Sequence, residues 1–436
     1  MEATHTYTHK KHKPYPAYKD SGIDWLGEIP AGWEVKKIKR FCLVKRGASP
    51  RPIEDPIYFD DNGEYSWVRI SDVSASNKYL YKTTQRLSDL GKSKSISLEL
   101  DEIFLSIAAT VGKPIITKIK CCIHDGFVYF VGLKEFKEYL YYIFSGGELY
   151  KGIGKFGTQL NLNTDTIGDI YLPIPPLPEQ HAIAEYLDRE TARLDTLIEK
   201  KQRLIELLRE KRAALITRAV TKGLNPDEPK KDSGIDWLGE IPVGWEVKKL
   251  KYSVNLINEK TDVLFDIQIY IGMENIESWT GKYLNNGSYN EIIGISNTFK
   301  KNDLLFGKLR PYLAKVFKCH SSGVCSSEFL VLRCINNSMN YLFYLLLSKS
   351  MIENINSSTY GTKMPRASWE YIGNIIIPIP PLPDQRAIAE FLDRETAKLD
   401  KLIEKIQTGI DKLKEYRTAL ISAAVTGKID VRDQVK

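Results

Sequence analysis

Residues 173–200 read "PIPPLPEQHAIAEYLDRETARLDTLIEK", and residues 378–405 read "PIPPLPDQRAIAEFLDRETAKLDKLIEK". The two stretches agree at 23 of 28 positions and lie 205 residues apart. A proline-rich run opens each stretch, and proline precedes a helix more readily than it lies inside one. Glu179 and Asp384 then suit the positive N-terminal end of a helix. Each stretch therefore predicts the start of a long helix.

Apolar residues recur every seven positions along both predicted helices, in two rows sustained over four to five heptads. Such rows are typical of a coiled coil. Gly223 and Gly427 are suitable stops, which makes each helix roughly 40 residues or about 60 Å long. The predicted coiled-coil core residues are Leu187, Leu194, Ile198, Ile205, Leu208, Leu215, Leu392, Leu399, Ile403, Ile406, Ile410, Leu413 and Leu420.

Charge is graded along both helices. Residues 179–199 hold six acids and two bases, whereas residues 200–222 hold two acids and eight bases. The second helix has six acids and four bases over 384–404, then two and five over 405–428. Each helix complements its own dipole in this way, but that effect is confined to the end turns. Because the gradient spans the whole helix, it favours antiparallel pairing, which sets each acidic half against a basic half.

A second repeat precedes the first one. Residues 19–37 (the first box) and 231–249 (the second box) agree at 18 of 19 positions, 212 residues apart. In contrast, residues 38–156 and 250–360 share almost nothing. The repeat of about two hundred residues is too long for a solenoid unit of roughly 20–50 residues. It indicates a duplicated domain plus helix. We refer to residues 38–172 as the first body and to residues 250–377 as the second body.

The order box, body, helix, repeated once, predicts the domain boundaries. If the frame is two-fold, the first box packs by the end of the second helix, as the second box packs by the end of the first. Trp25, Trp33, Trp237 and Trp245 would then be packing anchors. The predicted segments are a flexible arm (1–18), a first domain (19–177), a first helix (178–222), a linker (223–230), a second domain (231–382) and a second helix (383–428).

Composition indicates a soluble cytoplasmic protein. Apolar content of 43% and charged content of 27% suit buried cores, and a net charge of +7 favours an acidic partner such as DNA. No apolar run approaches the roughly 20 residues of a membrane helix, and the N-terminus lacks the apolar core of a secretory signal. Six cysteines without regular spacing predict neither a disulfide framework nor a zinc site. Two clusters combine cysteine with histidine, but neither has the paired spacing of a zinc site: Cys121, Cys122 and His124 form one, and Cys319, His320 and Cys325 form the other.

Two short motifs match patterns found in enzymes, but the surrounding sequence does not fit either pattern. The "GIGKFG" run at 152–157 fits a dinucleotide-binding pattern but follows a helical stretch rather than a strand, so a loop is expected. Pro226–Asp227 with Glu246–Lys248 fits a nuclease pattern, but the first pair lies in a polar linker where turn chemistry explains it. The sequence also has no phosphate-binding loop. We expect no catalytic centre and no metal site in this chain.

The chain resembles the specificity (S) subunits of Type I restriction-modification systems over nearly its whole length. The resemblance rests on the I-P-x-P-P-L-x-x-Q-x-x-I-x-x-x-L-D runs at Ile174 and Ile379 and on the body ends "GTQLNLNTDTIGDIYLPIPP" and "GTKMPRASWEYIGNIIIPIPP". It rests also on "DEIFLSIAATVGKP" (101–114) and "DLLFGKLRPYLAKV" (303–316). It implies an α+β fold with two globular mixed α/β target-recognition domains separated by two long antiparallel helices. These helices form a coiled coil with an internal pseudo-two-fold repeat.

The resemblance also implies a function. Each domain would read one part of a bipartite asymmetric sequence in double-stranded DNA. The helices would scaffold two methyltransferase (M) subunits and the restriction (R) subunits, which would carry S-adenosylmethionine, ATP and magnesium. The chain itself would be non-catalytic and hold no cofactor. Alternatives are an autonomous nuclease or methyltransferase, and an interaction protein without a nucleic-acid role. Basic and amide side chains suit phosphate and base contacts, and the candidates are Lys113, Lys155, Gln159, Lys308, Arg310, Lys315, Lys363 and Arg366.

Overall fold

The structure is a computed structural model that describes residues 13–133, 136–150, 155–156, 159–160, 162–261, 269–285, 295–361 and 363–434. Of residues 155–156 and 159–160 it describes the backbone alone. Contacts divide the chain into two units, Met1–Lys200 with Gly409–Lys436, and Lys201–Thr408. Each unit thus holds one box, one body and parts of both long helices. No helix in the described part of the chain is long and apolar enough to span a membrane.

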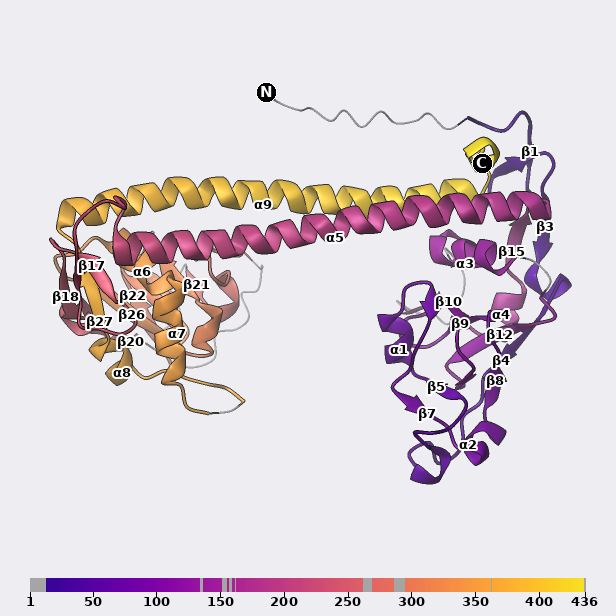
Figure 1. The fold of residues 1–436 in the computed structure, drawn as a ribbon, viewed down its shortest axis with the longest axis horizontal. Helices are drawn as coiled ribbons and strands as arrows, with labels where there is room; N and C mark the ends of the chain where they lie inside the picture. Colours follow the sequence, from indigo (N-terminus) through magenta and orange to yellow (C-terminus); the bar gives the residue numbers. More distant parts are fainter. Residues whose placement is uncertain are drawn as a thin grey trace. The chain divides into compact units, whose positions relative to one another are not determined.

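The long helices are α5 (Leu177–Lys222) and α9 (Leu382–Val425), which run antiparallel (Figure 1). In the first unit, Arg417 Nε of α9 lies 2.9 Å from Asp195 Oδ1 of α5. In the second unit, Arg212 Nε of α5 lies 3.0 Å from Asp400 Oδ1 of α9. Early residues of each helix thus meet late residues of the other, and the antiparallel pairing predicted from the charge gradient is confirmed.

The predicted coiled-coil core residues all lie away from solvent. Eight are buried, namely Leu187, Leu194, Ile205, Leu208, Leu392, Ile406, Ile410 and Leu420. The five that are half-buried are Ile198, Leu215, Leu399, Ile403 and Leu413. The residues at the helix ends also pack on the globular domains. Leu194 shares a core with the first body, and Leu392 shares one with the second.

The first unit contains short strands and helices. Its strands are β1 (Tyr18–Asp20), β2 (Glu28–Pro30), β3 (Glu34–Lys37), β4 (Leu43–Arg46), β5 (Ser66–Val68), β6 (Tyr79–Leu80), β7 (Gln85–Arg86), β8 (Ile96–Leu98), β9 (Ile103–Ser106), β10 (Pro114–Thr117), β11 (Cys121–Ile123), β12 (Phe127–Val131), β13 (Lys155–Phe156), β14 (Gln159–Leu160) and β15 (Tyr171–Ile174). Its shorter helices are α1 (Ile70–Ala75), α2 (Asp89–Ser93), α3 (Lys137–Gly146) and α4 (Thr164–Gly168), with the 3-10 turns η1 (Ile38–Arg40), η2 (Pro56–Tyr58), η3 (Glu148–Tyr150) and η7 (Arg432–Gln434).

The first body is built on two sheets. One has the order β4-β12-β9-β10-β6, and the other has the order β7-β5-β11-β8. Their apolar residues share one core, in which Phe104 and Phe127 of the first sheet join Cys121 of the second. Both rings meet edge to face, with centroids 5.2 Å apart. A larger core of the unit joins α3, the first box and the ends of both long helices.

The second unit contains a similar but smaller set of described elements. Its strands are β16 (Lys230–Asp232), β17 (Glu240–Pro242), β18 (Glu246–Lys249), β19 (Val254–Ile257), β20 (Lys260–Thr261), β21 (Tyr270–Ile271), β22 (Ser296–Phe299), β23 (Leu304–Gly307), β24 (Val316–Lys318), β25 (Gly323–Cys325), β26 (Phe329–Cys334) and β27 (Ile376–Ile379). Its shorter helices are α6 (Met339–Leu347), α7 (Lys349–Ser357) and α8 (Trp369–Asn374), with the turns η4 (Leu250–Tyr252), η5 (Met273–Asn275) and η6 (Pro311–Leu313).

The two bodies share the central strands of both sheets although their sequences diverge, and among the described residues they differ at the sheet edges, at β6, β7 and β20. The order β19-β26-β23-β24 matches β4-β12-β9-β10, and β22-β25-β21 matches β8-β11-β5. In the first body β11 pairs parallel with β5 and antiparallel with β8. In the second body β25 likewise pairs parallel with β21 and antiparallel with β22. Cys325 lies in the core between the sheets, as Cys121 does. The internal repeat therefore extends through the bodies as a fold.

Each box packs by the end of a long helix. In the second unit, Lys222 Nζ at the end of α5 donates to the carbonyl of Leu238 at 2.6 Å and to that of Glu240. In the first unit, Lys428 Nζ just beyond α9 donates to the carbonyl of Glu28 at 2.6 Å. The first box thus packs by the second helix as the sequence predicts. Trp33 and Trp245 are each 1% exposed and serve as anchors, while Trp25 and Trp237 are half-buried against the same cores.

Residues 13–18 of the predicted arm are packed. Tyr15 is 6% exposed, and its hydroxyl donates to Glu179 Oε1, which also accepts from Trp33 Nε1 at 3.0 Å. The backbones of Lys13 and Asp430 form an antiparallel β-bridge, and the Arg432 guanidinium lies 4.9 Å from the Tyr15 ring centroid. This part of the chain therefore joins the core of the first unit, which its polar composition did not predict. Residues 1–12 lie outside the described residues.

Candidate nucleic-acid interface

Each body is fixed to the long helices by the same set of side chains. Tyr142 Oη donates to Asp188 Oδ1 at 2.5 Å in the first unit, and Tyr344 Oη donates to Asp393 Oδ1 at 2.6 Å in the second. A lysine of each body pairs with the same carboxylate, Lys78 at 2.5 Å and Lys318 at 3.5 Å. A second tyrosine of α3 or α6 bonds two backbone carbonyls beside the helix ends. Both bodies are therefore held in equivalent orientations on their helices.

In the second body, two loops distant in sequence meet through backbone bonds. The loop after β23 (residues 308–315) and the loop before α8 (residues 359–368) form the second-body loop pair. Arg310 N donates to Pro365 O at 2.7 Å, and Ala367 N donates to Lys308 O at 3.0 Å. Four of the predicted DNA-contact residues, Lys308, Arg310, Lys363 and Arg366, are thereby brought to one surface.

The second-body loop pair presents exposed cations and aromatic rings. Arg310 and Lys363 are exposed, and so are Tyr312, Tyr360 and Met364. Arg310 has φ +50 and ψ +61, a left-handed conformation that only few non-glycine residues adopt. Such a conformation persists where surrounding bonds hold it, and it often occurs at functional sites. Basic side chains interleaved with aromatic ones suit a nucleic-acid surface.

Arg366 is paired with Glu328 in the turn between β25 and β26. The Arg366 Nη2 atom lies 2.8 Å from Glu328 Oε1, and Nε lies 3.2 Å from Oε2. This two-point contact raises the pKa of Arg366, because Glu328 bonds and attracts the guanidinium. Lys308 N in turn donates to Glu328 O at 2.9 Å. The turn therefore fixes both the loop and the guanidinium.

Two of the predicted contacts have intramolecular partners. Lys113 Nζ donates to the carbonyls of Ser74 and Ser76 at 3.2 and 2.6 Å, at the end of α1. Lys315 Nζ donates to the carbonyls of Met273 and Ile276 at 2.5 and 2.9 Å, at η5. Burial lowers the pKa of both ammonium groups. The two lysines occupy equivalent places, and the geometry favours a structural role, capping these helix ends, over the DNA contact predicted from sequence.

The remaining predicted contacts lie in the last loop of the first body. The side chains of Lys155 and Gln159 lie outside the described part of the structure. Their backbones belong to β13 and β14, which pair antiparallel, with Lys155 opposite Leu160. The glycines of the "GIGKFG" run also lie outside the described residues. For these residues the assignment to a DNA surface stays a prediction.

A cluster of basic residues surrounds the matching turn of the first body. Asp125, between β11 and β12, accepts from Arg51 Nη2 at 3.0 Å and from Ser49 Oγ at 2.9 Å. Its backbone carbonyl accepts from Arg46 Nε. The Asp125 pKa is lowered by these partners against the opposing effect of partial burial. Nearby, Ile107 N donates to Gly126 O at 2.9 Å, which is the equivalent of the Lys308–Glu328 backbone bond.

A cavity of about 680 Å³ lies beside this cluster, lined partly by Trp67, Gln85 and His124. The Gln85 Oε1 atom is buried and has no hydrogen-bond partner among the described residues. His124 Nδ1 accepts from Gly126 N at 2.9 Å, and burial lowers the His124 pKa although Asp125 opposes the shift. The neutral imidazole is therefore part of the turn that holds Arg51.

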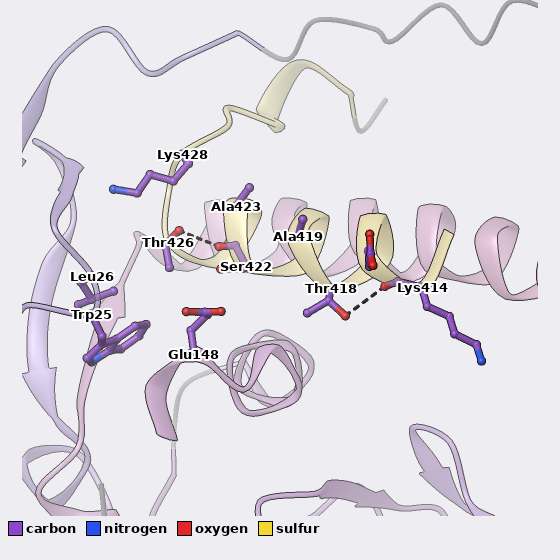
Figure 2. Close-up of a pocket in the computed structure, with 11 residues that line it drawn as sticks. Trp25, Leu26, Glu148, Lys414, Thr418, Ala419, Ser422, Ala423, Thr426 and Lys428 are labelled. Atoms are coloured by element: carbon purple, nitrogen blue, oxygen red, sulfur yellow. Dashed lines mark hydrogen bonds between the residues drawn. The ribbon is translucent and has the colours of Figure 1, made fainter. Parts of the chain in front are cut away.

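The first box and the end of α9 enclose a groove of about 750 Å³. Figure 2 shows Glu148 pointing toward the last turns of α9, with Trp25 beside it. By the repeats, Trp25 corresponds to Trp237 and Thr426 to Thr221. The box and α9 sides of the groove therefore lie on the part of the chain whose sequence recurs, whereas Glu148 belongs to the first body.

The motifs rejected from sequence have structural explanations. Asp227 N donates to Asn225 Oδ1 at 3.1 Å, a turn contact, and Lys248 Nζ pairs with Glu246 Oε2 at 2.7 Å. Cys121 and Cys325 are buried, and burial raises the pKa of the Cys325 thiol to about 12. Groups of three or more metal-ligating residues are absent from the described residues.

Sequence reasoning missed Arg51 and both acidic partners, Asp125 and Glu328. Arg51 lies in the polar run "ASPRPIEDP", and the only available signal was a cation in a segment that differs between the copies. The acids gave no signal, because each precedes a buried strand as turn residues commonly do. Only the fold shows that these residues gather at one turn in both bodies.

Comparison with known proteins identifies the family. The domain described as "Type I restriction modification DNA specificity domain" matches residues 30–207 and 242–412. The chain belongs to this family of DNA specificity subunits. It is a DNA-recognition subunit and not an enzyme in its own right.

Relatives of the specificity subunit cover almost the whole chain. It is 21% identical to the Type I restriction enzyme EcoDI specificity subunit of Escherichia coli, over 92% of this chain and 90% of that one. It is 28% identical to the MjaIX specificity subunit of Methanocaldococcus jannaschii, over 94% and 96%.

Solved structures share the fold. One, from a study of complex assembly and conformational transition in a type I R-M system, has a TM-score of 0.68 at 13% identity and covers 91% of this chain and 98% of its own. The HsdS subunit of Thermoanaerobacter tengcongensis has a TM-score of 0.50 at 14% identity and covers 92% and 98%. These likenesses confirm two globular domains with an antiparallel pair of long helices as the fold of this specificity subunit.

Proposed function

We propose that each body reads one half of a bipartite, asymmetric DNA target. The observation that supports this most is the contrast between fold and sequence. Both bodies have the same order of central strands and the same tyrosine–aspartate contact to a long helix, yet residues 38–156 and 250–360 share almost nothing. Base reading requires side chains matched to one sequence, so two bodies that read different sequences diverge on a common scaffold.

The repeated frame would dock two copies of a methyltransferase subunit. A partner that binds twice needs two similar surfaces, and the boxes with the adjoining helix ends provide them. The groove beside Trp25 is one such surface. Restriction subunits would join this assembly, and S-adenosylmethionine, ATP and magnesium would bind the partners. A subunit acting on cellular DNA with these partners would work in the cytoplasm.

The test is a genome-wide methylation map of cells that carry the complete system, compared with cells that lack this chain. The expected result is methylation at one two-part sequence with a fixed spacer, and none without the chain. A gel shift with the assembled complex should show binding to duplexes that contain both parts. Methylation at a single uninterrupted sequence would contradict the bipartite reading.

A groove variant tests the docking surface separately. Trp25→Ala with Trp237→Ala should reduce the number of methyltransferase subunits per complex in analytical ultracentrifugation. DNA binding by each body should persist. The matched control is Tyr81→Ala, since Tyr81 is 66% exposed on the first body and lies outside both boxes. Unchanged stoichiometry in the double variant would exclude this groove as the docking surface.

A further inference from the structure

The strongest unassigned feature is an acid-held arginine at the same turn of each body. In the first body Asp125 holds Arg51, and in the second Glu328 holds Arg366. The turns are equivalent, because Phe127 N donates to His124 O at 3.1 Å and Phe329 N donates to Ser326 O at 3.0 Å.

The arginines come from unrelated segments. Arg51 lies in the loop that follows β4, whereas Arg366 lies in the loop before α8. The two acids also occupy neighbouring rather than identical positions of the turn. The backbone carbonyls of Gly126 and Glu328 accept equivalent hydrogen bonds, so Glu328 corresponds to Gly126, the residue after Asp125. The two bodies thus share one feature despite their divergent sequences: an arginine side chain is paired with a carboxylate of the same turn. A repeated arrangement without repeated sequence points to a shared task.

The geometry leaves part of each guanidinium available. A guanidinium carries five N–H donors in a planar fork. Glu328 occupies the edge formed by Nε and Nη2 of Arg366, and the bonds described for that side chain leave Nη1 and one N–H of Nη2 for another acceptor pair. Arg51 uses Nη2 for Asp125, and its side chain is 74% exposed. Arg366 therefore presents its remaining donors from a position held at two points, and Arg51 presents its own from a more exposed side chain that is oriented at one point.

Charge distinguishes a base from a phosphate as the target. The guanidinium keeps its charge beside a carboxylate, but the pair as a whole has almost no net charge, so it contributes little to phosphate attraction and counterion release. The O6 and N7 atoms of guanine are neutral acceptors whose spacing matches two parallel N–H groups of arginine. The exposed cations Arg310 and Lys363 have no ion-pair partner in the described part of the chain, so they suit phosphate contacts better.

We infer that Arg51 and Arg366 each read a guanine, one in each half of the target, with Asp125 and Glu328 as positioning residues. This inference rests on the proposed function and names specificity-determining residues within it. Each carboxylate fixes the orientation of its guanidinium before DNA binds. The ordering cost of a long side chain is then met on folding rather than on binding.

The test uses the complete assembled complex. Binding is measured by competition between the wild-type target and duplexes in which each G·C pair of either half is replaced by A·T. For the wild-type complex, at least one such replacement in each half should weaken binding by roughly tenfold or more. Arg366→Lys should abolish this discrimination at one position of one half, and Arg51→Lys at one position of the other half. Both variants keep the charge but lose the planar fork.

A variant of the acid gives a second, independent readout. Glu328→Gln removes the carboxylate charge and leaves Arg366 in place with one fewer acceptor. Discrimination in the same half should fall, while affinity for non-specific duplex should rise, with a steeper salt dependence by about one counterion. The matched control is Arg203→Lys in the exposed pair Arg203–Glu206 on α5, which should leave the sequence read unchanged.

Each outcome decides the matter. If Arg366→Lys or Arg51→Lys weakens binding uniformly on every duplex, the arginines contact phosphate and the inference is overturned. It is overturned equally if neither half of the wild-type target contains a critical G·C pair, a result that needs no variant to fold. If the wild-type complex recognises no two-part target at all, the proposed function itself fails instead.

Discussion

Arg212 Nε of α5 lies 3.0 Å from Asp400 Oδ1 of α9, and 205 residues further on Arg417 Nε lies 2.9 Å from Asp195 Oδ1. The repeat thus places the same ion pair once in each unit, with the roles of the two helices exchanged. Their surroundings differ. The Arg212 and Asp400 side chains are 9% and 14% exposed, whereas those of Arg417 and Asp195 are 30% and 52% exposed.

The two ion pairs should therefore differ in their contribution to stability. Arg212→Met leaves the half-buried Asp400 with Lys282 Nζ at 3.1 Å as its remaining cation. It also removes a bond from Arg212 Nη1 to the Trp279 carbonyl at 2.8 Å. We expect a loss of about 2–3 kcal/mol in the free energy of unfolding of the second unit, less than for a buried charge left without any partner. Arg417→Met should cost under about 1 kcal/mol in the first. Urea unfolding with tryptophan fluorescence measures both, and equal losses would contradict the difference in burial.

The glycines after the two long helices provide a second matched pair. Both have positive φ, +77 at Gly223 and +72 at Gly427. A Cβ at Gly427 would overlap the Pro30 ring and come within 3.2 Å of Trp33, whereas at Gly223 the nearest atom, in Trp245, is 3.4 Å away.

Alanine should consequently be worse at position 427 than at 223. Each variant incurs about 1–2 kcal/mol for the left-handed conformation. Gly427→Ala adds overlap with the first box, for about 1–3 kcal/mol more. Differential scanning calorimetry should show the larger fall in transition temperature for Gly427→Ala. A larger fall for Gly223→Ala would mean that Pro30 and Trp33 of the first box move away from position 427 and so remove the overlap.

Acid should destabilise the first body through His124. Burial lowers its pKa below the ordinary value, and protonation would also cost the bond that Nδ1 accepts from Gly126 N. Asp125 Oδ1, 3.8 Å away, opposes this effect. Because the folded pKa is the lower one, the stabilising contribution is present above about pH 6.5 and is lost as the pH falls through the folded pKa.

The matching variant is His124→Asn, which keeps an acceptor near Gly126 N and does not titrate. Its unfolding temperature should fall less between pH 7 and pH 5 than that of the wild-type chain. His320→Asn is the control, since it removes a histidine that lies exposed in the second unit and outside the first body. Identical profiles for all three proteins would assign the acid sensitivity to carboxylates.

The shared topology of the bodies predicts that they can be exchanged one at a time. Each body has its own core between two sheets, with Phe104 and Phe127 in one and Phe299 and Phe329 in the other. Because Arg366 bonds Glu328 across the second body, an exchange should include the loop before α8 and cover residues 250–368.

The expected result is a methylation map in which one half-site changes and the other does not. The control exchange, residues 250–360, separates Arg366 from Glu328 and should give weaker or relaxed reading of the altered half. A change in both half-sites after the longer exchange would show that the bodies do not read DNA independently.

The sequence predicted the frame well and the reading surface poorly, for a physical reason. Helix periodicity, terminal glycines and charge gradients are local signals, and they located α5, α9 and their direction. The packing of Tyr15 against Glu179 and the carbonyl partners of Lys113 and Lys315 depend on residues far away in sequence. From sequence alone, a lysine that caps a helix cannot be distinguished from a lysine that faces DNA when both lie in a divergent loop. The fold alone separates these two uses.

The last prediction concerns the spacer between the half-sites. We expect the paired helices to set it, because α5 and α9 are continuous and each contributes residues to both units. Insertion at one helix alone is unsuitable near residue 214, since Arg212 bonds the Trp279 carbonyl while Ile216 lies in the second core. Seven residues should instead be added to both helices, after Lys200 and after Thr408, where the two units divide.

Seven residues preserve the heptad pattern and add about 10 Å of helix. This length corresponds to about three base pairs at 3.4 Å each. A methylation map of the variant should therefore show a longer spacer between unchanged half-sites. DNA also turns by roughly a third of its helical repeat over that length, so efficiency should fall unless the helices twist to follow. The control adds seven residues to α5 only, which mismatches the paired helices and should abolish methylation. A double insertion that keeps the original spacer at full efficiency would show that something other than the helices measures the target.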